Sequence, residues 1–197
     1  MTTSKRFLKA KQRQVHLMKF QRMGGDVRKI FVCGFKPSSG FGAEVNGFTN
    51  SELKQARKIW TPTLPPHVSA KSASTAAALC EANPLHSLEF APILRWAEAI
   101  WDAFRAPWFP NQGAAIFQSH ELVTLWLNIM DKWNSKNFTW QSATGLVAVA
   151  KLSALRLGLG WLSPSSMSHE DGTIIESTAD SPAAVKVKLH QIAVNRD

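Results

Sequence analysis

Apolar residues recur mostly at helical spacing along this chain. In residues 3–23 a loose apolar stripe runs among Lys and Arg residues, and Gly24-Gly25 is a typical helix stop. Residues 26–35 predict a short helix or a strand, because their apolar centre favours burial in either form. Residues 36–40, with the sequence Lys-Pro-Ser-Ser-Gly, predict a turn or loop. The N-terminal region therefore begins with one long helix.

A capping box predicts where the next helix begins. The Thr49 side chain can accept a hydrogen bond from the backbone N–H three residues on, and Glu52 can reach back to the cap. The apolar positions that follow fall largely on one face, and we expect the helix to end near Trp60. Three prolines in residues 61–66 then interrupt the chain, and we place a domain boundary there.

Further helices are predicted beyond the prolines, in residues 69–81, 88–105, 114–132 and 142–157. Pro92 lies in the first turn of the second of these, where its missing N–H costs nothing. Glu170-Asp171-Gly172 predicts a turn next to a short strand, so we expect a small β-hairpin. Ser181-Pro182 is a typical opening for a final helix.

These elements predict a mainly α fold. We expect an irregular multi-helix bundle with a basic N-terminal helical arm and a small C-terminal β-hairpin. The predicted parts are a basic helical arm in residues 1–60, a Trp-rich helical body in residues 61–160, and the hairpin with the last helix in residues 161–197.

Charge is concentrated in the arm. Residues 1–60 contain 13 Lys or Arg and three Asp or Glu, whereas the remaining residues contain 10 and 11. A basic segment joined to a near-neutral apolar body is typical of proteins that dock on polyanions, although a solvated helix face is the alternative. The candidate phosphate-binding residues are Lys5, Arg6, Lys9, Lys11, Arg13, Lys19, Arg22, Arg28, Lys29, Lys54, Arg57 and Lys58.

No residue pattern predicts an active site. His120-Glu121 begins like a zinc-protease helix, but the second His four residues on is missing. The glycines of residues 158–160 lack the third glycine of a dinucleotide fingerprint and follow a helix instead of a strand. Cys33 and Cys80 have no metal-ligand spacing, and we expect both to be small buried residues. We therefore expect no catalytic residue, no metal or other cofactor, and no enzymatic activity.

Eight tryptophans allow two interpretations. Four fall within helical apolar patterns and are expected in the core, namely Trp96, Trp101, Trp126 and Trp133. The other four lie at the ends of elements and could either stack on bases or cap the core, namely Trp60, Trp108, Trp140 and Trp161.

Targeting and membrane signals are weak. Lys151 and Arg156 interrupt the longest apolar stretch, so no transmembrane span is predicted. We expect an intracellular protein, nuclear or cytoplasmic. An organelle remains open as an alternative, because residues 1–25 hold seven Lys or Arg and no acidic residue, as in a transit segment.

One block of the sequence resembles a known family. Residues 31–37 (Phe-Val-Cys-Gly-Phe-Lys-Pro) and 41–48 (Phe-Gly-Ala-Glu-Val-Asn-Gly-Phe) are similar to the segment after the polymerase palm in reverse-transcriptase-like proteins of non-LTR retroelements, of the dinoflagellate type. In that family an arginine-rich helix leads to a Gly-x-x-Pro turn, an aromatic-Gly-x-Glu-Val-x-Gly motif and a Ser/Thr-x-x-Glu-Leu helix, as in residues 49–57 here. Phe41 stands where the family more often has Tyr.

This resemblance implies a thumb-like helical region and a connector that grip the backbone of template and primer. It also places the catalytic palm before Met1, and the chain contains no Phe/Tyr-x-Asp-Asp sequence to bind the metal ions of phosphoryl transfer. The expected function is a non-catalytic module that binds the backbone of RNA or DNA. Two alternatives stay open. The chain could be an accessory or structural subunit that docks on protein partners or a membrane through its basic arm and apolar Trp surface, or a retroelement remnant without activity.

Overall fold

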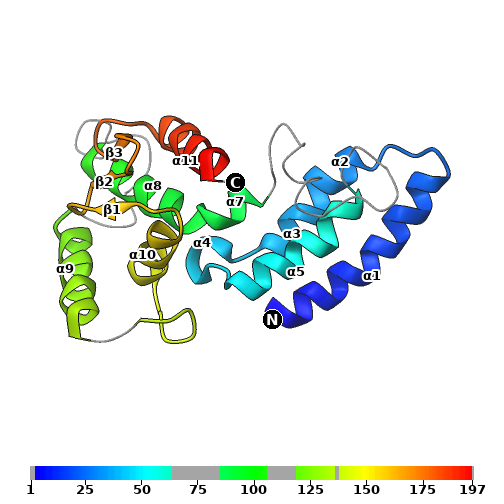
Figure 1. Ribbon diagram of the computed structural model, residues 1–197, viewed down its shortest axis with the longest axis horizontal. Coiled ribbons are helices and arrows are strands. Elements are labelled where there is room, and N and C mark those ends of the chain that lie inside the picture. Colours follow the sequence, from blue (N-terminus) through cyan, green and yellow to red (C-terminus); the bar gives the residue numbers. More distant parts are fainter. Residues whose placement is uncertain (1–2, 64–84, 106–118, 136–137, 197) are drawn as a thin grey trace. The chain divides into compact units, whose positions relative to one another are not determined.

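The computed structural model describes residues 3–63, 85–105, 119–135 and 138–196. The chain divides into two compact units (Figure 1). The first unit comprises Met1–Ala43 and Phe48–Glu89, and the second comprises Glu44–Gly47 and Phe90–Asp197. The predicted helix in residues 69–81, residues 64–66 of the break before it and the start of the helix predicted at residue 114 lie outside the described residues.

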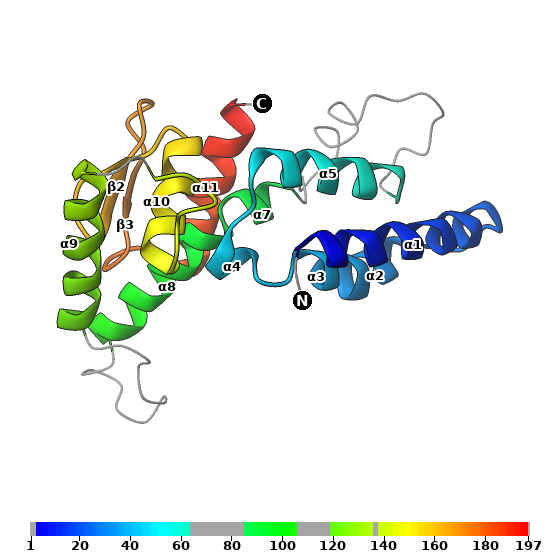
Figure 2. The same ribbon diagram turned by 90° about the horizontal axis from the view of Figure 1, so that it is seen from below.

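Helices form the described part of the first unit. Helix α1 (Thr3–Arg22) packs against α3 (Lys36–Gly40) and α5 (Asn50–Trp60), and Figures 1 and 2 show these helices side by side. Shorter pieces complete it: α2 (Arg28–Ile30), the π-helical turn Phe31–Phe35, the start of α4 (Ala43–Asn46), the 3₁₀ turn Thr61–Thr63 and α7 (His86–Glu89). The predicted long first helix is confirmed.

Residues 36–40 form a helix, so the predicted turn is wrong. Pro37 has no N–H, and in a regular α-helix its ring would also clash with the carbonyl four residues earlier. The π-helical turn widens the helix just before this point, since the Lys36 N–H donates to the Phe31 carbonyl oxygen, five residues back. Ser39 Oγ then donates to the Phe35 carbonyl oxygen at 2.8 Å. The helix therefore continues through a segment whose composition is typical of a loop.

The capping box at the start of α5 is confirmed. Glu52 N donates to Thr49 Oγ1 at 3.1 Å, and Thr49 N donates to Glu52 Oε2 at 2.8 Å. The buried face of α5 carries Leu53, Ala56 and Trp60, as its periodicity predicts. Two of the backbone N–H groups that lack partners at a helix start are thus satisfied by side chains.

Aromatic side chains fill the core of the first unit. Phe7 from α1 stacks on Phe48, with ring centroids 5.7 Å apart. Trp60 is fully buried and meets the edge of Phe31 at 5.7 Å, and its Nε1 donates to Ser39 Oγ at 3.0 Å. The Phe7 ring thereby links α1 to the residues just before α5, and the Trp60 ring links α5 to the helical segment that contains Pro37.

The second unit packs helices around a small sheet. Its helices are α8 (Ala91–Arg105), α9 (Ser119–Ser135), α10 (Leu146–Arg156) and α11 (Pro182–Arg196). The strands β1 (Gly160–Trp161), β2 (Ser166–Ser168) and β3 (Ile174–Glu176) pair antiparallel in that order. Met167 pairs with Trp161 on one side and Ile175 on the other, and all three side chains join the core.

The structure confirms a mainly helical fold with a small C-terminal β element. The sheet has three strands, however, because the two-residue strand β1 pairs with β2 beside the expected hairpin. Two helices begin differently from their prediction. Residues 88–105 divide at Phe90 into α7 and α8, and α10 begins at Leu146, because Gly145 adopts a φ of 86° that a helix does not allow.

Candidate nucleic-acid interface

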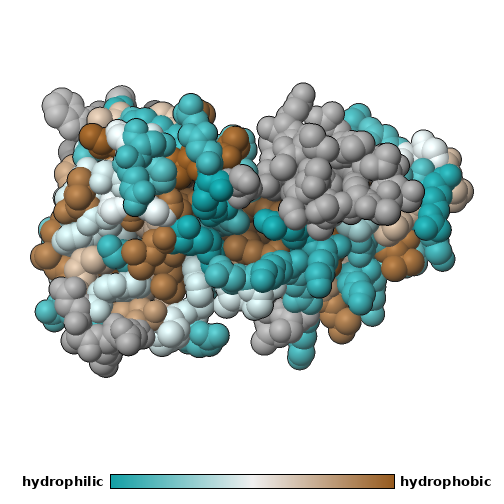
Figure 3. Space-filling model, in the orientation of Figure 1, coloured by the Kyte–Doolittle hydropathy of each residue, from teal (hydrophilic) through white to brown (hydrophobic). Residues whose placement is uncertain are grey.

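Helix α1 separates an apolar face from a basic face. Phe7, Ala10 and Leu17 are buried at spacings of three and seven residues, which places them on one side of the helix. The opposite side is hydrophilic with apolar interruptions, as Figure 3 shows along α1. The cations with exposed side chains on this helix are Lys5, Lys9, Lys11, Arg13, Lys19 and Arg22. The helix therefore holds its cations in solvent by burying its other face.

The two remaining helical segments present fewer cations. Lys54 and Lys58 are exposed one turn apart on α5, whereas Arg57 between them is half-buried. Lys29 in α2 is exposed. The side chain of Arg28 lies outside the described part of the structure.

Two of the predicted arginines contact other side chains of the first unit. The Arg6 guanidinium lies 5.9 Å from the centroid of the Phe41 ring, a cation–π distance, and Arg6 is half-buried. Arg13 Nη1 donates to Ser38 Oγ at 3.3 Å while its side chain remains exposed. Arg6 is thus less available to a phosphate than the lysines of the same helix.

Acidic residues do not neutralise the exposed lysines. Within the described ranges, Lys5, Lys9, Lys19, Lys54 and Lys58 form no ion pair, whereas ion pairs occur in the second unit. There Lys188 Nζ lies 2.6 Å from Asp180 Oδ2, and Arg95 Nη1 lies 3.3 Å from Glu98 Oε2. The first unit therefore directs an uncompensated positive charge toward solvent.

The tryptophans that the structure describes do not gather into one stacking surface. Trp60 and Trp96 are fully buried and Trp161 is 8% exposed, so these three build the core. Trp126 is half-buried and packs against the core, whereas Trp101 and Trp133 are half-buried outside the core cluster, which corrects their expected place. Arg105 covers the Trp101 ring at 3.7 Å and Arg156 covers Trp140 at 4.2 Å. Trp108 lies outside the described residues.

The other candidate sites named from the sequence do not form a metal site within the described residues. No group of three or more His, Cys, Asp or Glu there is placed to hold a metal ion, and His120 and Glu121 are both exposed on α9. Cys33 is exposed, so its expected burial is wrong, and Cys80 lies outside the described ranges. None of the described helices is long and apolar enough to cross a lipid bilayer.

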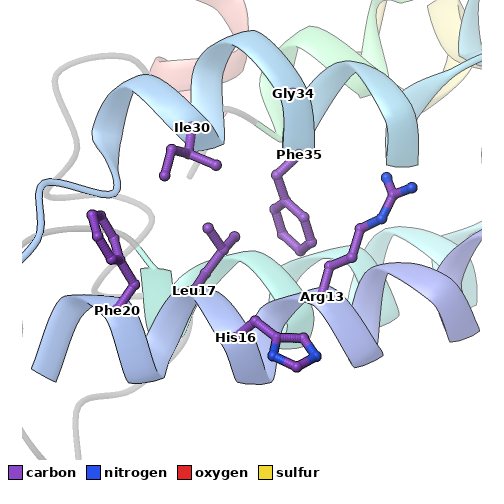
Figure 4. A pocket seen from close by; sticks show the side chains of 7 residues that line it. All are labelled: Arg13, His16, Leu17, Phe20, Ile30, Gly34 and Phe35. Carbon is purple, nitrogen blue, oxygen red and sulfur yellow. The ribbon is translucent and has the colours of Figure 1, made fainter. Parts of the chain in front are cut away.

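A groove beside the basic face was not predicted from the sequence. Arg13, His16, Leu17 and Phe20 line it from α1, and Ile30, Gly34 and Phe35 line it from the facing helical segment (Figure 4). Its volume is about 420 Å³. The spacing of the four α1 residues places them on one helical face, so the sequence could have indicated this wall of the groove. The opposite wall depends on how the π-helical turn packs, which spacing does not reveal.

Comparisons with known proteins leave the family open. No protein-family model matches the chain, and no curated protein or solved structure shows a significant match to it. The resemblance to reverse-transcriptase-like proteins therefore stays a prediction that depends on residues 31–58.

Proposed function

We propose that this chain is a non-catalytic module that binds the sugar–phosphate backbone of RNA or DNA, in the manner of a reverse transcriptase thumb and connector. One observation carries the proposal. The exposed lysines of α1 and α5 form no ion pair within the described residues, although the second unit contains several. Uncompensated lysines on a folded helical face are the arrangement that phosphate contact requires.

Backbone contact predicts a particular kind of binding. Each lysine that neutralises a phosphate releases condensed counterions, so affinity falls as salt rises. If about five phosphates are contacted, the logarithm of the association constant should fall with the logarithm of salt at a slope of about −4 to −5 on duplex DNA. The phosphate groups are the same whatever the base sequence, so duplexes of different sequence should bind with similar affinity.

The test is a salt series on defined duplexes. The full chain is titrated with a fluorescent DNA duplex and an RNA–DNA hybrid of equal length, and anisotropy is measured over several salt concentrations. We expect binding to both, with a steep negative slope and little effect of base sequence. Absent binding, or an affinity that does not change with salt, would contradict the proposal.

A second candidate function is an accessory subunit of a larger assembly. Leu8 is 61% exposed and Val15 is 51% exposed on α1, seven residues apart and thus on one side of the helix, with Lys11 and Lys19 close by in the sequence. Apolar side chains set among lysines also suit a protein partner or an anionic membrane surface. This function predicts that the chain co-floats with phosphatidylserine vesicles in a density gradient or copurifies with a protein partner. The double substitution L8S and V15S should abolish this association, and the chain should not bind nucleic acid.

A further inference from the structure

The groove of the first unit has one aromatic end whose position is fixed by the backbone. The Phe20 ring lies directly against Gly25, since a Cβ atom built on Gly25 would lie 2.3 Å from Phe20 Cε1. Gly25 N also donates to the Phe20 carbonyl oxygen at 3.0 Å, which closes the turn after α1. Phe20 nevertheless remains 44% exposed. Its ring is therefore held in place and still has a free surface.

The opposite wall leaves room for a planar group. Gly34 lines the groove, and apart from its chain neighbours and the nearby backbone of its own helix no described atom lies within 4 Å of the place where its Cβ would be. Leu17 and Phe35 close the base of the groove, and both are buried (Figure 4). A ligand that enters here would meet apolar and aromatic surface on several sides.

The rim adds positive charge at one end of the groove. Arg13 projects between the two helices in Figure 4, and it is exposed apart from its hydrogen bond to Ser38. Lys9 precedes Arg13 by one helical turn, about 6 Å along the axis, and Lys5 precedes Lys9 by another. An apolar slot at the end of a row of cations is complementary to a ligand that has a flat apolar part and successive negative charges.

We propose that this groove receives one unpaired nucleobase of a single strand whose phosphates lie along Lys5, Lys9 and Arg13. The inference rests on the proposed backbone binding and adds a site for a base. The base stacks on Phe20 beside Gly34, and apart from Arg13 and His16 the lining side chains are apolar, so stacking is the main contact and the site accepts any of the bases. A duplex has no free base to insert and uses the cations alone.

The experiment compares two strands of equal charge. One is an oligodeoxyadenylate of about ten nucleotides, within the usual site size of single-strand binding, and the other is an abasic strand of the same length. Because the phosphates are identical, the electrostatic contribution to binding is the same for both. We expect the strand with bases to bind about 5- to 100-fold tighter, the range that stacking of one base supplies.

Two substitutions locate the effect in the groove. G34L fills the slot without a steric clash at Cβ, and F20A removes a partly exposed ring. Both variants should bind the two strands alike and keep the wild-type salt slope, while circular dichroism confirms folding. V32L is the matched control, since Val32 is exposed on the same π-helical turn and does not line the groove.

The outcomes separate this inference from the proposed function. A missing salt dependence contradicts backbone binding itself. A normal salt slope with equal affinity for both strands, or a preference that survives in both G34L and F20A, overturns the base site alone. If dodecanoate shifts the Gly34 amide resonance and the adenylate strand does not, the groove binds an acyl chain and the inference is likewise wrong.

Discussion

The two units of this protein use their charged residues in opposite ways. In the second unit, Lys188 lies against Asp180 and also donates to the Ile174 carbonyl oxygen at 2.8 Å, so it ties α11 to β3. In the first unit, Lys54 and Lys58 reach solvent and form no ion pair within the described ranges. The charge of Lys188 thus serves the fold, whereas the charges of Lys54 and Lys58 remain available to a partner.

The same contrast appears in burial. Lys151 in α10 is partly buried 5.9 Å from the Trp161 ring, and burial lowers the pKa of its ammonium group because it disfavours the charged form. For Asp180, burial opposes ionisation, but hydrogen bonds from Lys188 and the Glu176 backbone N–H, together with the charge of Lys188, outweigh it and lower the pKa. These environments follow from side chains that contact the core. On the exposed faces of α1 and α5 the lysines lie in solvent, where a polyanion can reach them.

The largest expected effect on stability comes from a substitution in the core of the second unit. W96A removes a fully buried ring that meets Trp161 at 5.9 Å and donates to the Pro164 carbonyl oxygen at 2.8 Å. We expect a loss of about 3–5 kcal/mol in the free energy of unfolding, measured with urea. W101A is the control, because Trp101 is half-buried beneath Arg105 and should cost less. Equal losses would mean that the full burial of Trp96 gives it no larger role in stability than half-buried Trp101 has.

A smaller effect should come from the capping box of the first unit. T49A removes the oxygen that accepts from Glu52 N and should lower the free energy of unfolding by about 1 kcal/mol. N50A is the control, since Asn50 is exposed at the first position of the helix. Thermal unfolding of both variants checks this prediction, which is contradicted if N50A is the more damaging of the two.

Local motifs of this kind were predictable, whereas features that need packing were not. The capping box and the basic face of α1 depend on residues within a turn or two of each other, so spacing alone identified them. The helix through Pro37 depends on a π-helical turn, and strand β1 depends on partners six and eight residues away, at Met167 and Ser168. The groove needs two helices in contact, and no spacing within one helix predicts its second wall.

A pH profile sharpens the contrast in the second unit. Hydrogen bonds from the Thr173 hydroxyl and backbone N–H, together with His169, lower the pKa of Asp171 to about 2. A carboxyl whose pKa is lower in the folded state stabilises it above the unfolded pKa of about 4 and loses this effect as pH falls toward 2. The stability difference between wild type and D171N should therefore be present at pH 4 and shrink between pH 4 and 2. A difference that persists at pH 2 would contradict this assignment.

Two substitutions with the smallest expected change in stability test the contrast between the lysines of the two units most directly, because they alter binding without altering folding. K54Q removes one exposed charge from the first unit and K186Q removes one exposed charge from α11 of the second unit. Both should change the free energy of unfolding by less than about 0.5 kcal/mol, since neither lysine is buried. On duplex DNA, K54Q should reduce the salt slope by about 0.9, the contribution of one phosphate contact, while K186Q leaves it unchanged. If the two variants alter the slope equally, binding follows from net charge alone, and the lysines of the first unit have no special role.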